Sequence, residues 1–207
     1  MGRNWRAGVL ALAWLTASAA GAAETPAPSP AATPSPQATP SPSPIPAPGT
    51  ADSSLGAVVE LTTRPAAYIE GKATREEVYG AIIANLAKIR DAAAKAGLKT
   101  QGHAVAVFLT ADDDGFSYRA MAPLESLPSP PPVLPDPIKL GQTPVGKAMK
   151  FEHRGEYDDI DSTYEAITAY LDEKGVDAQD VFVEEYLNEP KGADDPNGQV
   201  DIYVLLR

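Results

Sequence analysis

The sequence predicts an α+β fold in which two strand-helix-strand-strand units join into one antiparallel sheet. Two observations lead to this prediction: an amphipathic helical pattern that occurs twice, at a shift of 78 positions, and short strand-like segments on both sides of each copy. Neither unit can bury its sheet face alone, so we expect the units to pair edge to edge with both helices on one face. The opposite face would then form a concave groove along the pseudo-twofold axis.

Length and composition limit the possible classes of protein. The chain has 207 residues, which suits one domain of ordinary size together with flanking segments. It contains no cysteine, which excludes a disulfide framework and thiolate metal sites. Its formal net charge of -11 at pH 7 argues against binding to a phosphate backbone, which needs clustered Lys and Arg. We therefore expect no nucleic-acid partner.

The first 23 residues have the pattern of a signal peptide. Arg3 and Arg6 precede an apolar run from Ala7 to Trp14, and small residues follow as far as Ala23. An uncleaved anchor is the alternative, but the apolar run is shorter than the roughly 20 residues that span a bilayer. The expectation is cleavage of residues 1–23 and export to the periplasm or the extracellular space, with no membrane span in the mature chain.

Residues 24–54 differ in composition from everything that follows. They consist mainly of Pro, Ala, Ser and Thr, with almost no large apolar side chain that could form a core. Such segments favour extended polyproline II conformations of about 3.1 Å per residue. We interpret 24–54 as a disordered linker and 55–207 as the folded domain.

The first predicted helix follows a capping-box pattern at Thr74–Glu77 and ends before Gly97. Its apolar positions are spaced by four, three and four residues and comprise Ile82, Leu86, Ile89 and Ala93. Strand-like segments are predicted before it at 57–61 and 66–70. Two more are predicted after it at 103–110 and 116–122, around an acidic turn at 112–115.

The second predicted helix repeats this spacing and ends before Gly175, with Asp158 or Asp159 as its N-cap. Its core positions are Ile160, Tyr164, Ile167 and Leu171. Strands are predicted before it at 145–153 and after it at 181–187 and 200–206. Four core positions and a terminal glycine thus share one offset, which indicates an internal repeat.

Two motifs in the second half resemble those of the GyrI-like family, also called the bacterial transcription-activator effector-binding domain. The family has an H-x-G-x-Y turn before its second helix, and this chain has His153, Gly155 and Tyr157 at those positions. The family also has a strand with E-x-Y followed by a polar stretch and proline, which corresponds here to Glu184, Tyr186 and Pro190. Residues 143–207 match throughout, and the first half matches in layout. No DNA-binding region accompanies the domain, and the proline-rich insertion at 126–137 departs from the family.

The resemblance implies a groove between the two halves, lined by aromatic rings and containing a glutamate that pairs with cationic or polar aromatic ligands. Strand alternation places Phe182, Glu184 and Tyr186 on one face. We expect the alternate aliphatic residues Val181, Val183 and Leu187 to meet the helices, so that Glu184 faces the groove. The 78-residue shift makes Ala106 its counterpart. The candidate rings are Tyr68, Phe108, Tyr118, Tyr186 and Tyr203.

Binding of a small molecule is the function that these features favour, without catalysis. The alternatives are a hydrolase of electrophilic compounds, with Glu184 as base and Tyr118 or Tyr186 as proton donor, and a protein-interaction module. Glu184 could also lie at a solvated strand edge. His103 and His153 lack zinc-site spacing, and no cofactor motif is present, so neither a metal nor a cofactor is expected.

Overall fold

A computed structural model of the chain describes residues 55–112, 115–189 and 191–207. The predicted signal peptide (1–23) and linker (24–54) lie outside these residues, so both stay predictions. The elements in chain order are β1 (Leu55–Leu61), β2 (Pro65–Ala73), α1 (Val78–Lys95), β3 (Ala104–Asp112), β4 (Gly115–Pro123), β5 (Lys139–Gln142), β6 (Gly146–Arg154), the 3-10 turn η1 (Tyr157–Asp159), α2 (Ile160–Lys174), β7 (Ala178–Tyr186) and β8 (Gln199–Leu206). No helix in the described ranges is long and apolar enough to cross a membrane.

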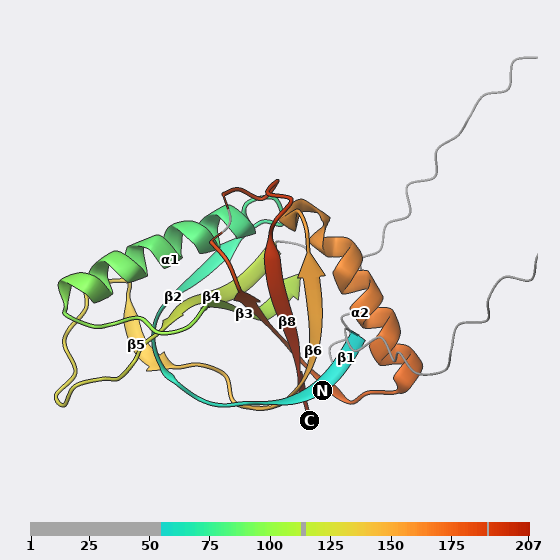
Figure 1. Cartoon of the computed structure of the whole chain (residues 1–207), viewed down its shortest axis with the longest axis horizontal. Coiled ribbons are helices and arrows are strands. Elements are labelled where there is room, and N and C mark those ends of the chain that lie inside the picture. Colours follow the sequence, from blue (N-terminus) through green and yellow to red (C-terminus); the bar gives the residue numbers. More distant parts are fainter. Residues whose placement is uncertain (1–54, 113–114, 190) are drawn as a thin grey trace, which may run out of the picture. The chain divides into compact units, whose positions relative to one another are not determined.

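The strands form one sheet of eight in the order β1-β6-β8-β7-β3-β4-β2-β5, and the neighbouring strands are antiparallel. The first unit is β2-α1-β3-β4 and the second is β6-α2-β7-β8. They join through β3 and β7, whose pairing places Ala106 opposite Glu184. The predicted α+β fold with a single antiparallel sheet and two helices is confirmed (Figure 1).

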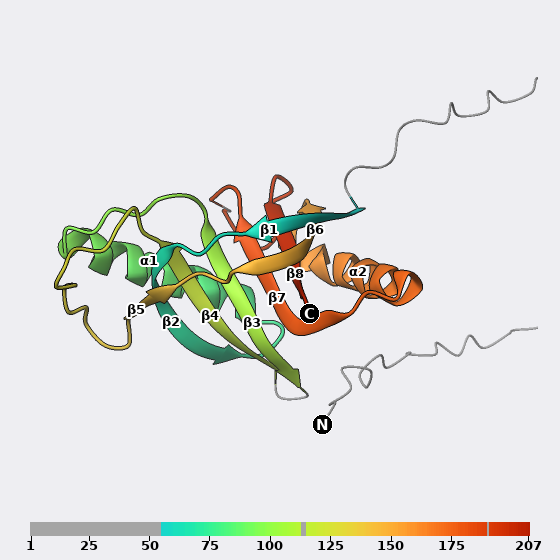
Figure 2. The ribbon, with the colours of Figure 1, turned by 90° about the horizontal axis from the view of Figure 1, so that it is seen from below.

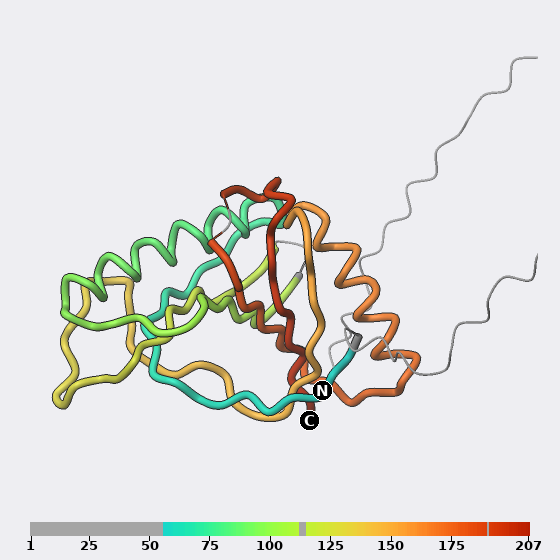
Figure 3. Tube along the Cα trace, in the orientation of Figure 1, coloured from blue at the N-terminus to red at the C-terminus, as the bar shows by residue number. Residues whose placement is uncertain are grey.

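The two units exchange their outer strands. β1 precedes the first unit but pairs with β6 of the second, whereas β5 precedes the second unit but pairs with β2 of the first. Both chain connections, 62–64 and 143–145, therefore run across the sheet face that carries no helix (Figures 2 and 3). β5 was not predicted, because it is short and follows the proline-rich insertion.

The predicted helical core positions lie against the sheet. Ile82, Leu86, Ile89 and Ala93 of α1 are buried, as are Ile160 and Ile167 of α2, while Tyr164 and Leu171 are half-buried. Gly175 ends α2 in the left-handed conformation that glycine adopts readily. The predicted side-chain caps are not formed: Thr74 donates its hydroxyl to the Glu77 carboxylate, and the Asp159 side chain makes no capping bond.

Both helices cover the same face of the sheet. Their buried residues form one core with alternate residues of the strands, including Ala106, Phe151, Phe182 and Tyr186. A second, smaller cluster on the opposite face contains Val105, Val107, Met121 and Val183. The prediction that Val183 and its aliphatic neighbours meet the helices is therefore wrong. Both faces of β7 are apolar, so hydrophobicity alone did not distinguish the helix side.

Candidate functional site

Glu184 lies at the middle of the sheet, on β7, and its side chain is fully buried on the helix side. It is paired in register with Ala106 of β3 on one side and Ile202 of β8 on the other. The Ala106 pairing agrees with the 78-residue repeat. One half of the domain thus places a carboxylate at the centre, and the other half places a methyl group there.

Three tyrosine hydroxyls donate hydrogen bonds to the Glu184 carboxylate. Tyr164 of α2 donates to Oε1 at 2.7 Å, Tyr186 of β7 to Oε2 at 2.7 Å, and Tyr157 of η1 to Oε2 at 2.9 Å. A buried carboxylate is stable only when its oxygens are bonded in this way. The three donors come from a strand, a helix and a turn, so the cluster depends on the tertiary fold of the second unit.

The turn that carries Tyr157 is held by a buried histidine. The ring nitrogens of His153 lie 2.8 Å from Oγ1 of Thr163 and 2.9 Å from the carbonyl oxygen of Glu156. Gly155 has a φ of 129°, a conformation that other residues rarely adopt, and it redirects the chain from β6 into η1. His153 and Gly155 therefore position Tyr157 over Glu184.

Burial dominates the electrostatics of this cluster. It raises the pKa of the Glu184 carboxyl above its ordinary value, although the three hydroxyl donors act in the opposite direction. Burial and the neighbouring Glu184 charge raise the pKa values of Tyr157, Tyr164 and Tyr186 well above their usual range. The tyrosines therefore remain protonated donors at physiological pH.

Tyr79 closes the cluster from the first unit. Its ring lies on that of Tyr157 with a centroid separation of 4.2 Å, and its hydroxyl donates to the carbonyl oxygen of Gly192. Tyr79 and Tyr157 are related by the same shift of 78 positions as the helices, so the repeat brings an equivalent ring from each half together. The cavity beside Tyr79, Tyr157 and Tyr186 is about 10 Å³, which is room for about one water.

The predicted site residues are divided between the two faces of the sheet. Of the predicted rings, Tyr186 is hydrogen-bonded to Glu184, whereas Tyr118 accepts a hydrogen bond from Asn85 and Phe108 packs against Phe116. Tyr68 and Tyr203 lie on the face without helices, so they are not part of the Glu184 cluster. The expected groove position for Glu184 is wrong, because β7 presents it to the helices.

Three members of this cluster were not predicted as site residues. Tyr157 was noted only as part of the motif before the second helix, Tyr164 was predicted as a helical core residue, and Tyr79 was not singled out. The repeat contained a usable signal, because Tyr79 and Tyr157 share the offset of the helical core positions. Among the described residues, no group of three or more His, Cys, Asp or Glu side chains is arranged to hold a metal ion.

Two repeated strand-helix-strand-strand units that enclose a buried carboxylate and several aromatic rings define a class of small-molecule-binding domain. The family model for the GyrI-like small molecule binding domain matches residues 57–207, and the chain belongs to that family. A search of curated protein sequences found none with significant similarity to this chain.

Solved structures share the fold at low sequence identity. The EcmrR C-terminal domain superposes with a TM-score of 0.62 at 13% identity, covering 73% of this chain and 96% of that one. SAV2435 bound to tetraphenylphosphonium gives 0.51 at 12% identity, covering 73% and 93%. EcmrR in its DNA complex gives 0.61 at 14% identity, but the match spans only 57% of that chain. These similarities establish the fold of the domain.

Proposed function

We propose that this protein binds a lipophilic aromatic cation at Glu184 and acts as an exported binding protein. The observation that carries the proposal is a fully buried carboxylate surrounded by tyrosine rings, with Ala106 opposite it. A buried carboxylate without a cationic partner keeps most of its desolvation cost, and an arriving cation relieves that cost. Each ring face adds about 0.5–2 kcal/mol of attraction for the cation.

Ligand entry requires the rings of Tyr79 and Tyr157 to separate, because the cavity beside them holds about one water. Besides the contacts of Tyr79, two ion pairs on the surface link this side of the first unit to the second. Arg75 pairs with Asp161 and Arg90 pairs with Glu189, and the four side chains are between 43% and 82% exposed. Exposed ion pairs typically contribute about 0–1 kcal/mol each. The cation would then replace tyrosine donors at the Glu184 carboxylate.

The relative SAV2435 was solved with tetraphenylphosphonium, which makes this cation a suitable probe. Calorimetric titration of the purified protein should detect its binding, while the neutral aromatic triphenylphosphine oxide should bind at least about tenfold more weakly. Glu184→Gln should weaken tetraphenylphosphonium binding by about tenfold or more, equivalent to about 1.4 kcal/mol. Glu165→Gln, an equal charge change at an exposed position on α2, should have no effect.

Two results would contradict the proposal. Equal affinity for the cation and the neutral compound would remove the carboxylate from recognition, and so would unchanged affinity in Glu184→Gln. If Glu184→Gln does not fold, Tyr79→Leu removes a ring face without altering the carboxylate. That variant should bind the cation a few-fold more weakly and should fold normally, because it retains an apolar side chain.

A hydrolase is the second candidate function, supported by two observations at Glu184. The pKa of Glu184 is raised by burial, and the Tyr186 hydroxyl lies within hydrogen-bond reach at 2.7 Å, as a base and proton donor would require. Turnover of an activated ester that is lost in Glu184→Gln would favour this function. Tight cation binding without turnover would favour the binding protein.

The proposal of export rests on the N-terminal pattern of residues 1–23. Fusing residues 1–54 to a reporter that is active only outside the cytoplasm should give activity in a bacterial host. Replacing part of the apolar run 7–14 with charged residues should abolish that activity. Equal reporter activity with and without the replacement would contradict export by this segment.

A further inference from the structure

The sheet face without helices contains a second hollow. It is about 50 Å³ in volume and lies where the two crossing connections pass over the sheet. Val105 and Val183 form its apolar floor. It is bordered by Leu61, the last residue of β1, and by Pro144 of the second connection. The hollow follows from the exchange of β1 and β5, because that exchange carries both connections over this face.

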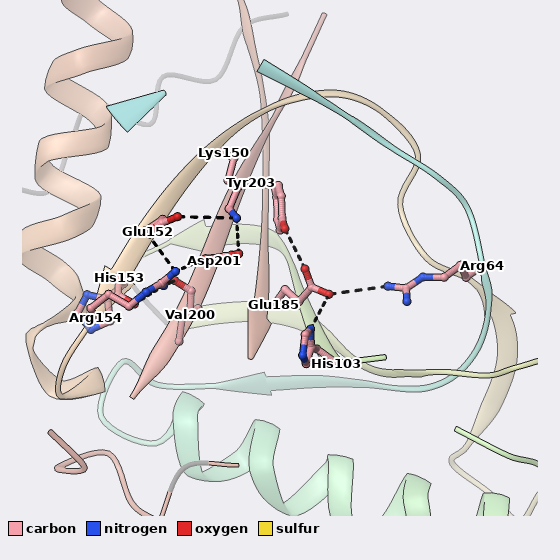
Figure 4. A network of polar contacts seen from close by, with 10 residues as sticks. All are labelled: Arg64, His103, Lys150, Glu152, His153, Arg154, Glu185, Val200, Asp201 and Tyr203. Carbon is pink, nitrogen blue, oxygen red and sulfur yellow. Dashed lines mark hydrogen bonds and ion pairs between the residues drawn. The ribbon is translucent and has the colours of Figure 1, made fainter. Parts of the chain in front are cut away.

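Glu185 points into this hollow, on the face opposite to Glu184. Its Oε2 accepts a hydrogen bond from the Tyr203 hydroxyl at 2.8 Å, and its Oε1 lies 3.3 Å from Nδ1 of His103 (Figure 4). Its side chain is 19% exposed, whereas Glu184 is fully buried. The carboxylate therefore remains accessible from the hollow.

Arg64 supplies a positive charge across the hollow. Its backbone is fixed to Thr143, because Arg64 N donates to the Thr143 hydroxyl at 3.0 Å and Thr143 N donates to the Arg64 carbonyl at 2.9 Å. Its side chain is 38% exposed, and Nη2 of the guanidinium lies 3.9 Å from Oε1 of Glu185. An ion pair that is this long and this exposed contributes little to stability, so a ligand can replace it readily.

Asp201, a neighbouring carboxylate on the same face, has much closer ion pairs than Glu185. Asp201 is buried and forms two short ion pairs, at 2.6 Å with Lys150 and at 2.8 Å with Arg154 (Figure 4). Its charge is matched within the protein. The charges of Glu185 and Arg64 are matched only loosely, although they border an open hollow.

We propose that this hollow binds a small zwitterion of the α-amino-acid type. Its ammonium group would pair with Glu185, its carboxylate would pair with Arg64, and its apolar side chain would lie on Val105 and Val183. A ligand with only a positive charge would be attracted by Glu185 but repelled by Arg64. A ligand with only a negative charge would be attracted by Arg64 but repelled by Glu185. A ligand with both charges satisfies both groups, and the volume limits it to a few heavy atoms beyond the charged groups.

The test is a titration of the isotope-labelled protein, followed through the methyl NMR signals of Val105 and Val183. The probes are valine, isobutylamine and isobutyrate, which carry both charges, only the positive charge and only the negative charge. Valine should shift both signals and saturate below about 10 mM, a concentration that would nearly fill a site with a Kd of about 1 mM. The singly charged compounds should bind at least about tenfold more weakly.

Variants identify the charges involved. Glu185→Gln and Arg64→Gln should each weaken valine binding at least about tenfold. Glu70→Gln, on the same face but three strands away from β7, should not. If either site variant fails to fold, Thr62→Trp provides a further test, because it would obstruct the exposed rim without altering a charge. Absence of methyl shifts, equal binding of all three probes, or binding unaffected by these variants would overturn the proposal. None of these outcomes would affect the Glu184 site, which lies on the other face.

Discussion

Glu184 and Glu185 are consecutive residues of one strand, yet they occupy opposite environments. Glu184 is fully buried beneath the helices and accepts hydrogen bonds from three tyrosines. Glu185 faces a partly open hollow, with one tyrosine donor and a loose ion pair to Arg64. The difference arises from strand alternation alone. The fold, and not the residue type, therefore determines which of the two carboxylates is buried and which is accessible.

The largest expected difference concerns removal of each carboxylate. Glu184→Ala leaves three buried hydroxyl donors without their acceptor, and an unsatisfied buried polar group costs about 1–3 kcal/mol. Since the tyrosines can partly rearrange, we expect the free energy of unfolding to fall by about 2–4 kcal/mol. Glu185→Ala should lower it by less than about 1 kcal/mol. Urea denaturation of both variants measures the difference, and equal losses would contradict the contrast.

A smaller effect is expected from single donors. Tyr164→Phe removes the hydroxyl that donates to Glu184 at 2.7 Å, and a hydrogen bond to a buried charged group contributes about 1.5–3 kcal/mol. Tyr203→Phe removes the corresponding donor to the more exposed Glu185 and should cost about 1 kcal/mol or less. The same denaturation experiment compares them. If Tyr203→Phe lowered the free energy of unfolding more than Tyr164→Phe, the hydrogen bond to Glu185 would contribute more to stability than the one to Glu184, which would contradict the comparison.

The smallest expected effect is a pH dependence. The folded state raises the pKa of Glu184, so it favours the protonated carboxyl more than the unfolded chain does. Stability from this group is fully present below the ordinary pKa of 4.5 and is lost as the pH rises through the raised pKa. The difference in unfolding free energy between the native protein and Glu184→Gln should therefore decrease with rising pH, by at most about 1.4 kcal/mol per pH unit. A difference that is constant or increases would be inconsistent with the raised pKa.

Much of the fold was predictable because the repeat is visible in the sequence. The helical positions and the correspondence of Ala106 with Glu184 followed from one offset, and the single antiparallel sheet followed from the need of each unit to bury its sheet face. The exchange of β1 and β5 was not predictable, because strand pairing at a sheet edge leaves no local pattern. The capping bonds were also not predictable, because Thr74 and Glu77 bond to each other instead of to the helix backbone.

The site was predicted only in part. Glu184 and Tyr186 were identified, but the face was not, because Phe182 and Val183 make both sides of β7 equally apolar. Tyr164 has the spacing of a helical core residue, and its hydroxyl finds Glu184 only through the packing of α2. The spacing of apolar residues along a helix does not reveal which partner a tyrosine hydroxyl will find. This is why Tyr164 was interpreted as a core residue.

The most direct test of the central claim is to follow the Glu184 carboxyl by carbon NMR during a pH titration, with and without tetraphenylphosphonium. In the free protein the pKa should lie above the ordinary value, because the side chain is buried. A bound cation favours the charged form, so the pKa should fall when tetraphenylphosphonium is added. A pKa that is the same with saturating cation and without it would contradict the account, because the cation would then be bound elsewhere.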